Sequence, residues 1–165
     1  MIVFGVCPGL SAVAYSVLLC EGSGLALPLD NDVLHAGRGV VPRTAAEIAK
    51  RWRAHTLILD VVFERNPPAL LAVGPPADSS EPAEHVFAAR LAAKGIATLL
   101  RIPWRDYASM PDLLGALGVD RPRIMTSEVK RSLRGVLGTR DRRVLTATAA
   151  AIAAYRHHRA GLDPG

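Results

Sequence analysis

The chain has 165 residues, of which 50% are hydrophobic and 21% charged, a balance that suits one globular domain and excludes a disordered chain. Its formal net charge of +5 at pH 7 favours an acidic partner such as nucleic acid. Its two cysteines, Cys7 and Cys20, are too few for a disulfide framework and form no Cys-x-x-Cys pair that would suggest zinc, so they fit a reducing, cytoplasmic setting.

The apolar N-terminus is not expected to be a signal peptide. It lacks a positively charged start, because the first Lys or Arg is Arg38, and Pro8-Gly9 interrupts the apolar run. No stretch of about 18 residues avoids Gly, Pro and charge together, so we expect no membrane span.

The first part of the chain predicts three strands that form an antiparallel meander. Apolar, β-rich runs cover residues 2–7 and 12–20, and a glycine-containing turn leads into a third run at about 25–29. Residues 33–42 contain two glycines and a proline and predict a loop.

The next segment predicts a helix and then a strand. Thr44 and Glu47 form a capping-box pattern, which predicts a helix over about 45–54. Residues 56–62 are a near-continuous apolar run interrupted by one acid, Asp60, and they give the strongest strand pattern in the chain.

The rest of the chain predicts further helices and one strand. We expect a short helix at 69–73, a linker at 74–81, a helix at 82–94, a strand at 96–102, a short helix near 111–117, and two closing helices at about 126–137 and 141–159. On the last helix, Val144, Ala147, Ala151 and Ala154 fall near one face. This order predicts a single α/β domain over residues 1–160, with a tail at 161–165 and helices flanking a mixed sheet.

Three segments share a pattern with one family of nucleases. They are residues 4–9 (Phe-Gly-Val-Cys-Pro-Gly), residues 59–66 (Leu-Asp-Val-Val-Phe-Glu-Arg-Asn) and residues 145–153 (Leu-Thr-Ala-Thr-Ala-Ala-Ala-Ile-Ala). Their order and spacing resemble those of RuvC-type Holliday junction resolvases. The resemblance implies a ribonuclease-H-like fold, in which a three-strand antiparallel meander is joined to parallel strands.

The resemblance also implies where catalytic acids would stand. Such nucleases hold magnesium ions with a cluster of carboxylates. The corresponding positions here are Cys7, Asp60, Leu145 and Thr148. Only Asp60 is a carboxylate, and sulfur is a ligand that magnesium disfavours. We therefore expect cleavage to be lost or strongly weakened and no metal or other cofactor to be bound, with magnesium expected only if the protein is active.

Positive charge gathers late in the chain. Residues 121–159 contain ten Lys or Arg against two acids, whereas residues 1–37 contain three acids and no Lys or Arg. This predicts a phosphate-binding face, with a solvated helical surface as the plain alternative. The candidate nucleic-acid-binding residues are Phe63, Arg65, Asn66, Lys130, Arg131, Arg134, Arg142 and Arg143. Phe63 stands where the resemblance implies an aromatic wedge, although a core position would also explain it, and Asn66 could equally cap a helix.

Three functions remain open from the sequence. The first is a RuvC-like protein that binds branched or duplex DNA in recombination or repair as a homodimer, because the family it resembles grips a junction with two subunits. The second is an active endonuclease in which Asp60 works with Asp30, Asp32 or Asp141. The third is a pseudoenzyme that serves as a protein-interaction module without a role on DNA.

Overall fold

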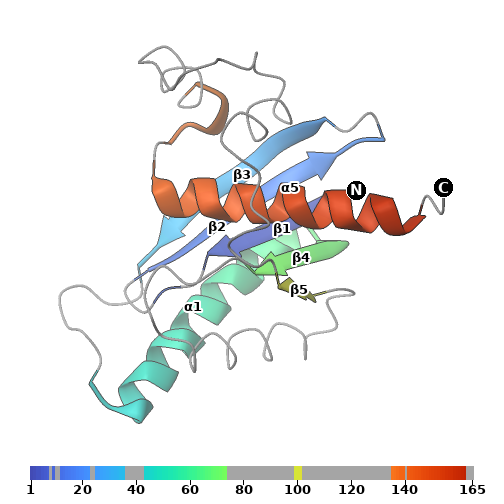
Figure 1. The fold of residues 1–165 in the computed structure, drawn as a ribbon. Coiled ribbons are helices and arrows are strands. Elements are labelled where there is room, and N and C mark those ends of the chain that lie inside the picture. Colours follow the sequence, from blue (N-terminus) through green and yellow to red (C-terminus); the bar gives the residue numbers. More distant parts are fainter. Residues whose placement is uncertain are drawn as a thin grey trace.

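The structure is a computed structural model that describes residues 1–7, 9, 12–22, 25–35, 43–73, 99–101, 135–139 and 141–162 (Figure 1). Its strands are β1 (Ile2–Cys7), β2 (Val13–Cys20), β3 (Ala26–Leu34), β4 (Leu70–Val73) and β5 (Leu99–Arg101), and its long helices are α1 (Ala45–Arg65) and α5 (Arg142–Leu162). Neither of these two helices is long and apolar enough to cross a membrane.

The five strands form one mixed sheet in the order β3-β2-β1-β4-β5. The pairs β1–β2 and β2–β3 are antiparallel, whereas β1–β4 and β4–β5 are parallel. The sheet therefore joins a three-strand meander to parallel strands, and the predicted fold class is confirmed.

The two long helices pack on opposite faces of the sheet. Along β1, Phe4 and Val6 lie in a buried cluster with Leu59 of α1. The alternate residues Val3 and Cys7 lie in clusters with α5. This alternation follows from the pleat, which turns successive side chains to opposite faces. In Figure 1, α5 crosses the near face of the sheet.

Small residues allow α5 to lie very close to β1. A Cβ atom built on Gly5 would overlap the carbonyl oxygen of Ala147, so only glycine leaves room there. The face of α5 that meets the sheet consists largely of alanine, and the predicted set of Val144, Ala147, Ala151 and Ala154 is buried. The hydroxyl of Tyr155 donates a 2.6 Å hydrogen bond to the Glu21 carbonyl, which ties α5 to the end of β2.

The predicted strand at 56–62 is wrong, because α1 continues without a break from Ala45 to Arg65. The capping box of Thr44 and Glu47 is confirmed as its start. No glycine or proline occurs between Ala45 and Pro67 to interrupt the helix. The buried residues His55, Leu59 and Val62 recur at helical spacing. The apolar run therefore belongs to both faces of a helix, one buried and one exposed.

The predicted helix at 69–73 is also wrong, because Leu70–Val73 form β4. This short apolar run pairs with β1 in parallel, and the Ala69 amide donates to the Ile2 carbonyl just before the strand begins. Leu70, Leu71 and Ala72 are buried, which suits a parallel strand covered on both faces.

Other expectations meet the structure only in part. Strand β5, Leu99–Arg101, lies within the predicted strand at 96–102. Helix α5 ends at Leu162, beyond the predicted end at residue 159 and within the predicted tail. Residues 135–137 are helical, as expected for the end of the helix at 126–137. The predicted linker at 74–81 and the helices at 82–94 and 111–117 lie outside the described residues.

Candidate functional site

Cys7 ends β1 beside the first turns of α5. Its side chain is only 2% exposed and packs in a cluster with Ala14, Val144 and Ala147. The guanidinium of Arg143 lies within electrostatic range of Cys7. Its pKa is raised mainly by hydrogen bonding to Asp141, and Cys7 acts in the same direction. The structure thus brings Cys7 together with the start of the last helix, as the resemblance implies.

Thr148 is fully buried on the face of α5 that meets the sheet. Its hydroxyl donates to Ser16 Oγ of β2 at 2.8 Å, and the Val144 carbonyl oxygen lies 2.9 Å away as a second acceptor. Ser16 is also fully buried. The two hydroxyls satisfy each other inside the core, so Thr148 joins α5 to the sheet.

The groups at this contact do not fit a magnesium ion. Cys7 offers a buried sulfur, Leu145 offers only carbon, and the hydroxyl of Thr148 is engaged in the core. Magnesium prefers anionic oxygen ligands. Across the described parts of the chain, no group of three or more His, Cys, Asp or Glu side chains could hold a metal ion.

Asp60 does not join Cys7. It lies half-buried on α1, between the buried Leu59 and the exposed Val61. Helix α1 packs on the face of the sheet opposite to α5, whereas Cys7 faces α5. The parallel neighbour of β1 is β4, with the sequence Leu-Leu-Ala-Val, and it contributes no acid. The assignment of Asp60 to a strand end beside Cys7 is therefore wrong, because residues 56–62 are helical.

The other candidate acids are divided between the two faces. Tyr15, whose side chain lies in the cluster with α1, donates a 3.1 Å hydrogen bond to Asp30. Burial raises the pKa of Tyr15 above its usual range, and Asp30 and Asp32 add to this effect. Asp141 lies instead at the start of α5. These acids do not assemble around Asp60, so the described residues give no support to a rearranged acid set.

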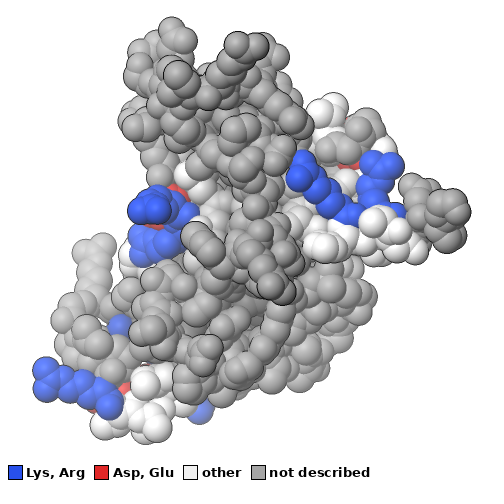
Figure 2. Space-filling view, in the orientation of Figure 1, with Lys and Arg blue, Asp and Glu red and all other residues white. Residues whose placement is uncertain are grey.

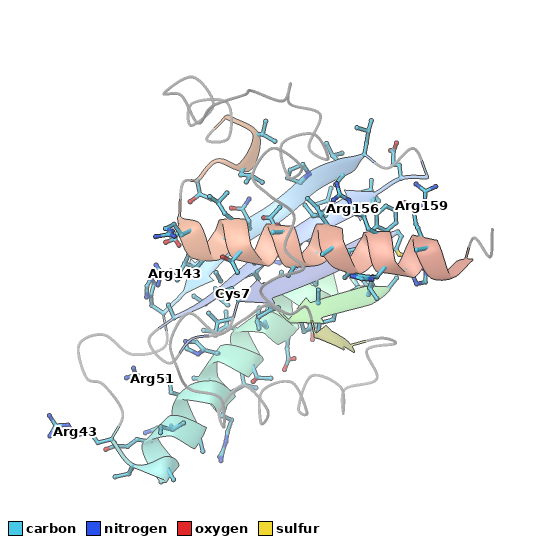
Figure 3. All side chains as sticks on the ribbon, viewed as in Figure 1. Cys7, Arg43, Arg51, Arg143, Arg156 and Arg159 are labelled. Atoms are coloured by element: carbon cyan, nitrogen blue, oxygen red, sulfur yellow. The ribbon has the colours of Figure 1, made fainter. Side chains whose placement is uncertain are left out.

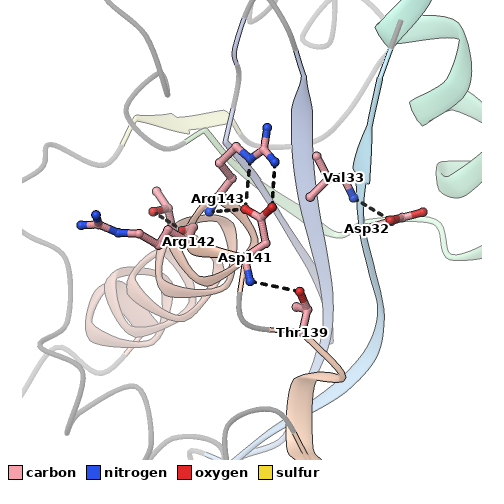
Figure 4. A network of polar contacts seen from close by, with 7 residues as sticks. Asp32, Val33, Thr139, Asp141, Arg142 and Arg143 are labelled. Atoms are coloured by element: carbon pink, nitrogen blue, oxygen red, sulfur yellow. Dashed lines mark hydrogen bonds and ion pairs between the residues drawn. The ribbon is translucent and has the colours of Figure 1, made fainter. Parts of the chain in front are cut away.

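Asp141 caps α5 and holds Arg143 (Figure 4). Its carboxylate accepts hydrogen bonds from the Arg143 backbone amide at 2.9 Å, from Nε at 3.0 Å and from Nη2 at 2.7 Å. These contacts hold the pKa of Asp141 below its usual value. Arg142 is exposed and extends away from this pair.

The other predicted contact residues take structural positions or lie outside the described residues. Phe63 packs edge-on against Phe4, with ring centroids 4.7 Å apart at an interplanar angle of 79°. It is half-buried, so core packing accounts for much of its surface. Arg65 is exposed in the last turn of α1, and Asn66 is its C-cap. The remaining candidates, Lys130, Arg131 and Arg134, lie outside the described residues.

Basic side chains gather at both ends of α5. Figure 2 shows Lys and Arg side chains over the start of this helix and again towards its C-terminal end. Figure 3 places Arg143 near Cys7 and Arg156 and Arg159 at the opposite end. Sequence reasoning missed Ser16, although a serine among apolar residues of a strand was a usable signal for a buried polar contact.

Comparison with known proteins places the fold. No family model and no curated protein matches the sequence. The chain resembles Thermus thermophilus RuvC in complex with a Holliday junction substrate, with a TM-score of 0.66 and 20% identity over 98% of this chain and 96% of that one. A second structure of that RuvC gives 0.62 and 22%, over 98% of this chain and 97% of that one.

The likeness extends to a viral enzyme. The fowlpox virus resolvase in complex with its substrate Holliday junction DNA gives a TM-score of 0.51 at 10% identity, over 98% of this chain and 99% of that one. Identities this low establish the fold alone. The chain therefore has the fold of RuvC-type Holliday junction resolvases, as the sequence resemblance implied.

Proposed function

We propose that the chain is a RuvC-like protein that binds branched or duplex DNA in recombination or repair, in the reducing setting of the cytoplasm, and that its cleavage activity is lost or strongly weakened. The observation that carries DNA binding is the likeness, over 98% of the chain, to a RuvC structure in complex with a Holliday junction substrate. The formal net charge of +5 supports the same partner.

The packing around Cys7 supports the loss of cleavage. Metal-assisted attack on a phosphodiester needs ions that activate water and stabilise the leaving oxygen. Cys7 and Thr148 are instead almost wholly buried parts of the contact between the sheet and α5. Neither side chain is an anionic oxygen ligand, so the described residues of this contact supply no counterpart of the family's carboxylate cluster.

The outward face of α1 supports a homodimer. Leu57, Ile58 and Val61 are 62%, 40% and 50% exposed. Large apolar side chains grouped on one helix are typical of a protein interface. They also explain why residues 56–62 are apolar at positions that do not face the core.

The charges on α1 favour a second copy as the partner of this face. Lys50 and Arg53 precede Leu57, whereas Asp60 and Glu64 follow it. At 3.6 residues per turn, Lys50, Leu57 and Glu64 lie nearly in line along the helix. Two antiparallel copies of α1 that cross at Leu57 would place Lys50 of one copy opposite Glu64 of the other. Such self-complementarity is what a two-fold interface requires.

A binding assay tests the DNA partner. We expect a labelled four-way junction to bind the chain and to lose roughly 10³-fold or more in affinity between about 50 and about 200 mM salt, because phosphate contacts release counterions. Fluorescence anisotropy with junction, duplex and single-stranded DNA measures this. Equal and negligible binding to all three would overturn the proposed function.

A cleavage assay tests the inactivity separately. Labelled junction incubated with the chain and magnesium or manganese is expected to remain intact, while an active resolvase run in parallel nicks it symmetrically. Symmetric nicks that require the added metal would show that cleavage survives and would contradict the proposed loss.

A further inference from the structure

Arginines from two helices lie at the end of the molecule where β1 ends. Figure 3 shows Arg143 and Cys7 at the start of α5, with Arg51 and then Arg43 following towards the N-terminus of α1. Arg156 and Arg159 lie at the other end of α5. We call Arg43, Arg51, Arg142 and Arg143 the arginine edge.

Electrostatic contacts show that these elements share one edge. His35, directly after β3, lowers the pKa of Asp141 at the start of α5, where hydrogen bonding to Arg143 is the main cause. His35 also lowers the pKa of His55 in α1, where burial is the main cause and Arg51 contributes. The start of α5, the end of β3 and the first half of α1 are therefore near one another.

The acids at this edge are engaged with backbone amides. Glu47 accepts hydrogen bonds from the amides of Arg43 and Thr44, at 2.8 and 3.1 Å. Asp141 accepts the Arg143 amide, and Asp32 accepts the Val33 amide at 2.7 Å (Figure 4). Each of these carboxylates accepts a backbone amide, and Asp141 also pairs with the guanidinium of Arg143. Hydrogen bonds from the Arg43 and Thr44 amides lower the pKa of Glu47, and Arg51 acts in the same direction. Arg43 and Arg142 are exposed.

We propose that the arginine edge tracks the phosphate backbone of one arm of the bound DNA. The inference rests on the proposed function and adds the path of the DNA. From Ala45 to Arg51, α1 rises about 9 Å, and Arg43 lies just before the N-cap of the helix. The helical part alone corresponds to between two and three nucleotides at about 3.4 Å per step. Guanidinium groups suit this role because they bind phosphate oxygens through paired donors.

The position of Cys7 agrees with this path. The thiol lies beside Arg143, and the resemblance assigns this position to a catalytic acid. DNA on the arginine edge would therefore pass over the part of the fold where the resembled nucleases cut. Arg143 uses Nε and Nη2 for its bonds to Asp141, so Nη1 is the nitrogen that would donate to a phosphate.

Two double variants with equal charge change test the inference. The edge variant combines Arg51→Gln with Arg142→Gln and so removes one half-buried and one exposed arginine. The far-end variant combines Arg156→Gln with Arg159→Gln. It removes one exposed and one half-buried arginine from the other end of α5. Arg143 is left in place because its side chain holds Asp141, the residue that caps α5. Junction binding is measured by anisotropy across a salt series, and circular dichroism checks that each variant is folded.

The edge variant is expected to bind the junction at least about tenfold more weakly than the unchanged chain. The slope of log affinity against log salt concentration should become shallower by about 2, because each of the two lost phosphate contacts contributes about 0.9 to that slope. The far-end variant should keep most of the slope of the unchanged chain. Equal losses in the two variants would overturn the inference but leave DNA binding intact. Absence of binding by the unchanged chain would overturn the proposed function, and the path with it.

Discussion

At the scale of single residues, Thr148, to which the resemblance assigns a catalytic position, is part of the core. Thr148 and Ser16 are both 0% exposed and share a 2.8 Å hydrogen bond. A buried hydroxyl pair of this kind contributes on the order of 1 kcal/mol, and removing one partner costs more because the other is left unsatisfied. The same atoms that fail as magnesium ligands therefore stabilise the contact between α5 and β2.

His55 makes stability depend on pH. It is 0% exposed, and burial, with Arg51 and His35 acting in the same direction, lowers its pKa from 6.5 to about 4. Between these values the unfolded chain takes up a proton that the folded chain does not. We expect the free energy of unfolding to be nearly unaffected by this group above about pH 6.5 and to fall by on the order of 3 kcal/mol towards pH 4.

Urea unfolding at a series of pH values measures this effect. The His55→Gln variant should have a flatter pH profile than the unchanged chain over this range. His157→Gln, at an exposed position of α5, serves as the control and should leave the profile unchanged. A profile that stays the same in the His55→Gln variant would show that another group titrates.

At the scale of elements, the close approach of β1 and α5 depends on Gly5. A Cβ there would overlap the Ala147 carbonyl, which belongs to the backbone and cannot turn aside. We expect Gly5→Ala to destabilise the fold by about 3 kcal/mol through overpacking. Gly161→Ala, where an added Cβ meets nothing within 4 Å, should be neutral or slightly stabilising because it lies in a helix. Thermal unfolding compares them, and equal midpoints would mean that α5 lies further from the sheet.

The elements that the sequence predicted well are those with one buried face or an explicit boundary. Strand β1 was bounded by Pro8, and the start of α1 was marked by its capping box. Residues 56–62 misled because Leu57, Ile58 and Val61 are apolar without being in the core. Period alone cannot distinguish a strand from a helix that is apolar on two faces.

The candidate site was predictable only where local sequence determines position. Cys7 closes a strand, and the alanine stripe of α5 marks the face that meets it, so their contact could be expected. Asp60 was misplaced because its position relative to Cys7 depends on which segment pairs with β1. That partner is β4, a run of only four residues. Its pairing with β1 depends on tertiary packing and is not determined by local strand propensity.

At the scale of the whole molecule, the face of α1 centred on Leu57 predicts the oligomeric state. We expect the chain to sediment as a dimer and Leu57→Glu to sediment as a monomer in analytical ultracentrifugation, because a charge would be placed at the two-fold axis. Leu27→Glu, at a residue 55% exposed on the edge strand β3, is the matched control and should remain a dimer. A monomeric unchanged chain, or dissociation by Leu27→Glu alone, would contradict this interface.

A charge exchange tests the antiparallel arrangement. Lys50→Glu should weaken the dimer, because it would then face Glu64 of the other copy. Combining it with Glu64→Lys should restore the dimer, since the opposite charges then meet in reversed order. Failure of the second change to restore association would exclude this pairing of the helices.

The dry contact around Thr148 has a consequence for any acid introduced at this position. An aspartate placed at 148 would enter a space that is closed to solvent and adjacent to the Ser16 hydroxyl. There the carboxyl would stay protonated, since burial raises its pKa, and a neutral acid has little attraction for a divalent cation. Such an acid could bind a metal ion only if α5 first moved away from the strands. A single substitution to aspartate at 148 would therefore cost stability without supplying a metal ligand.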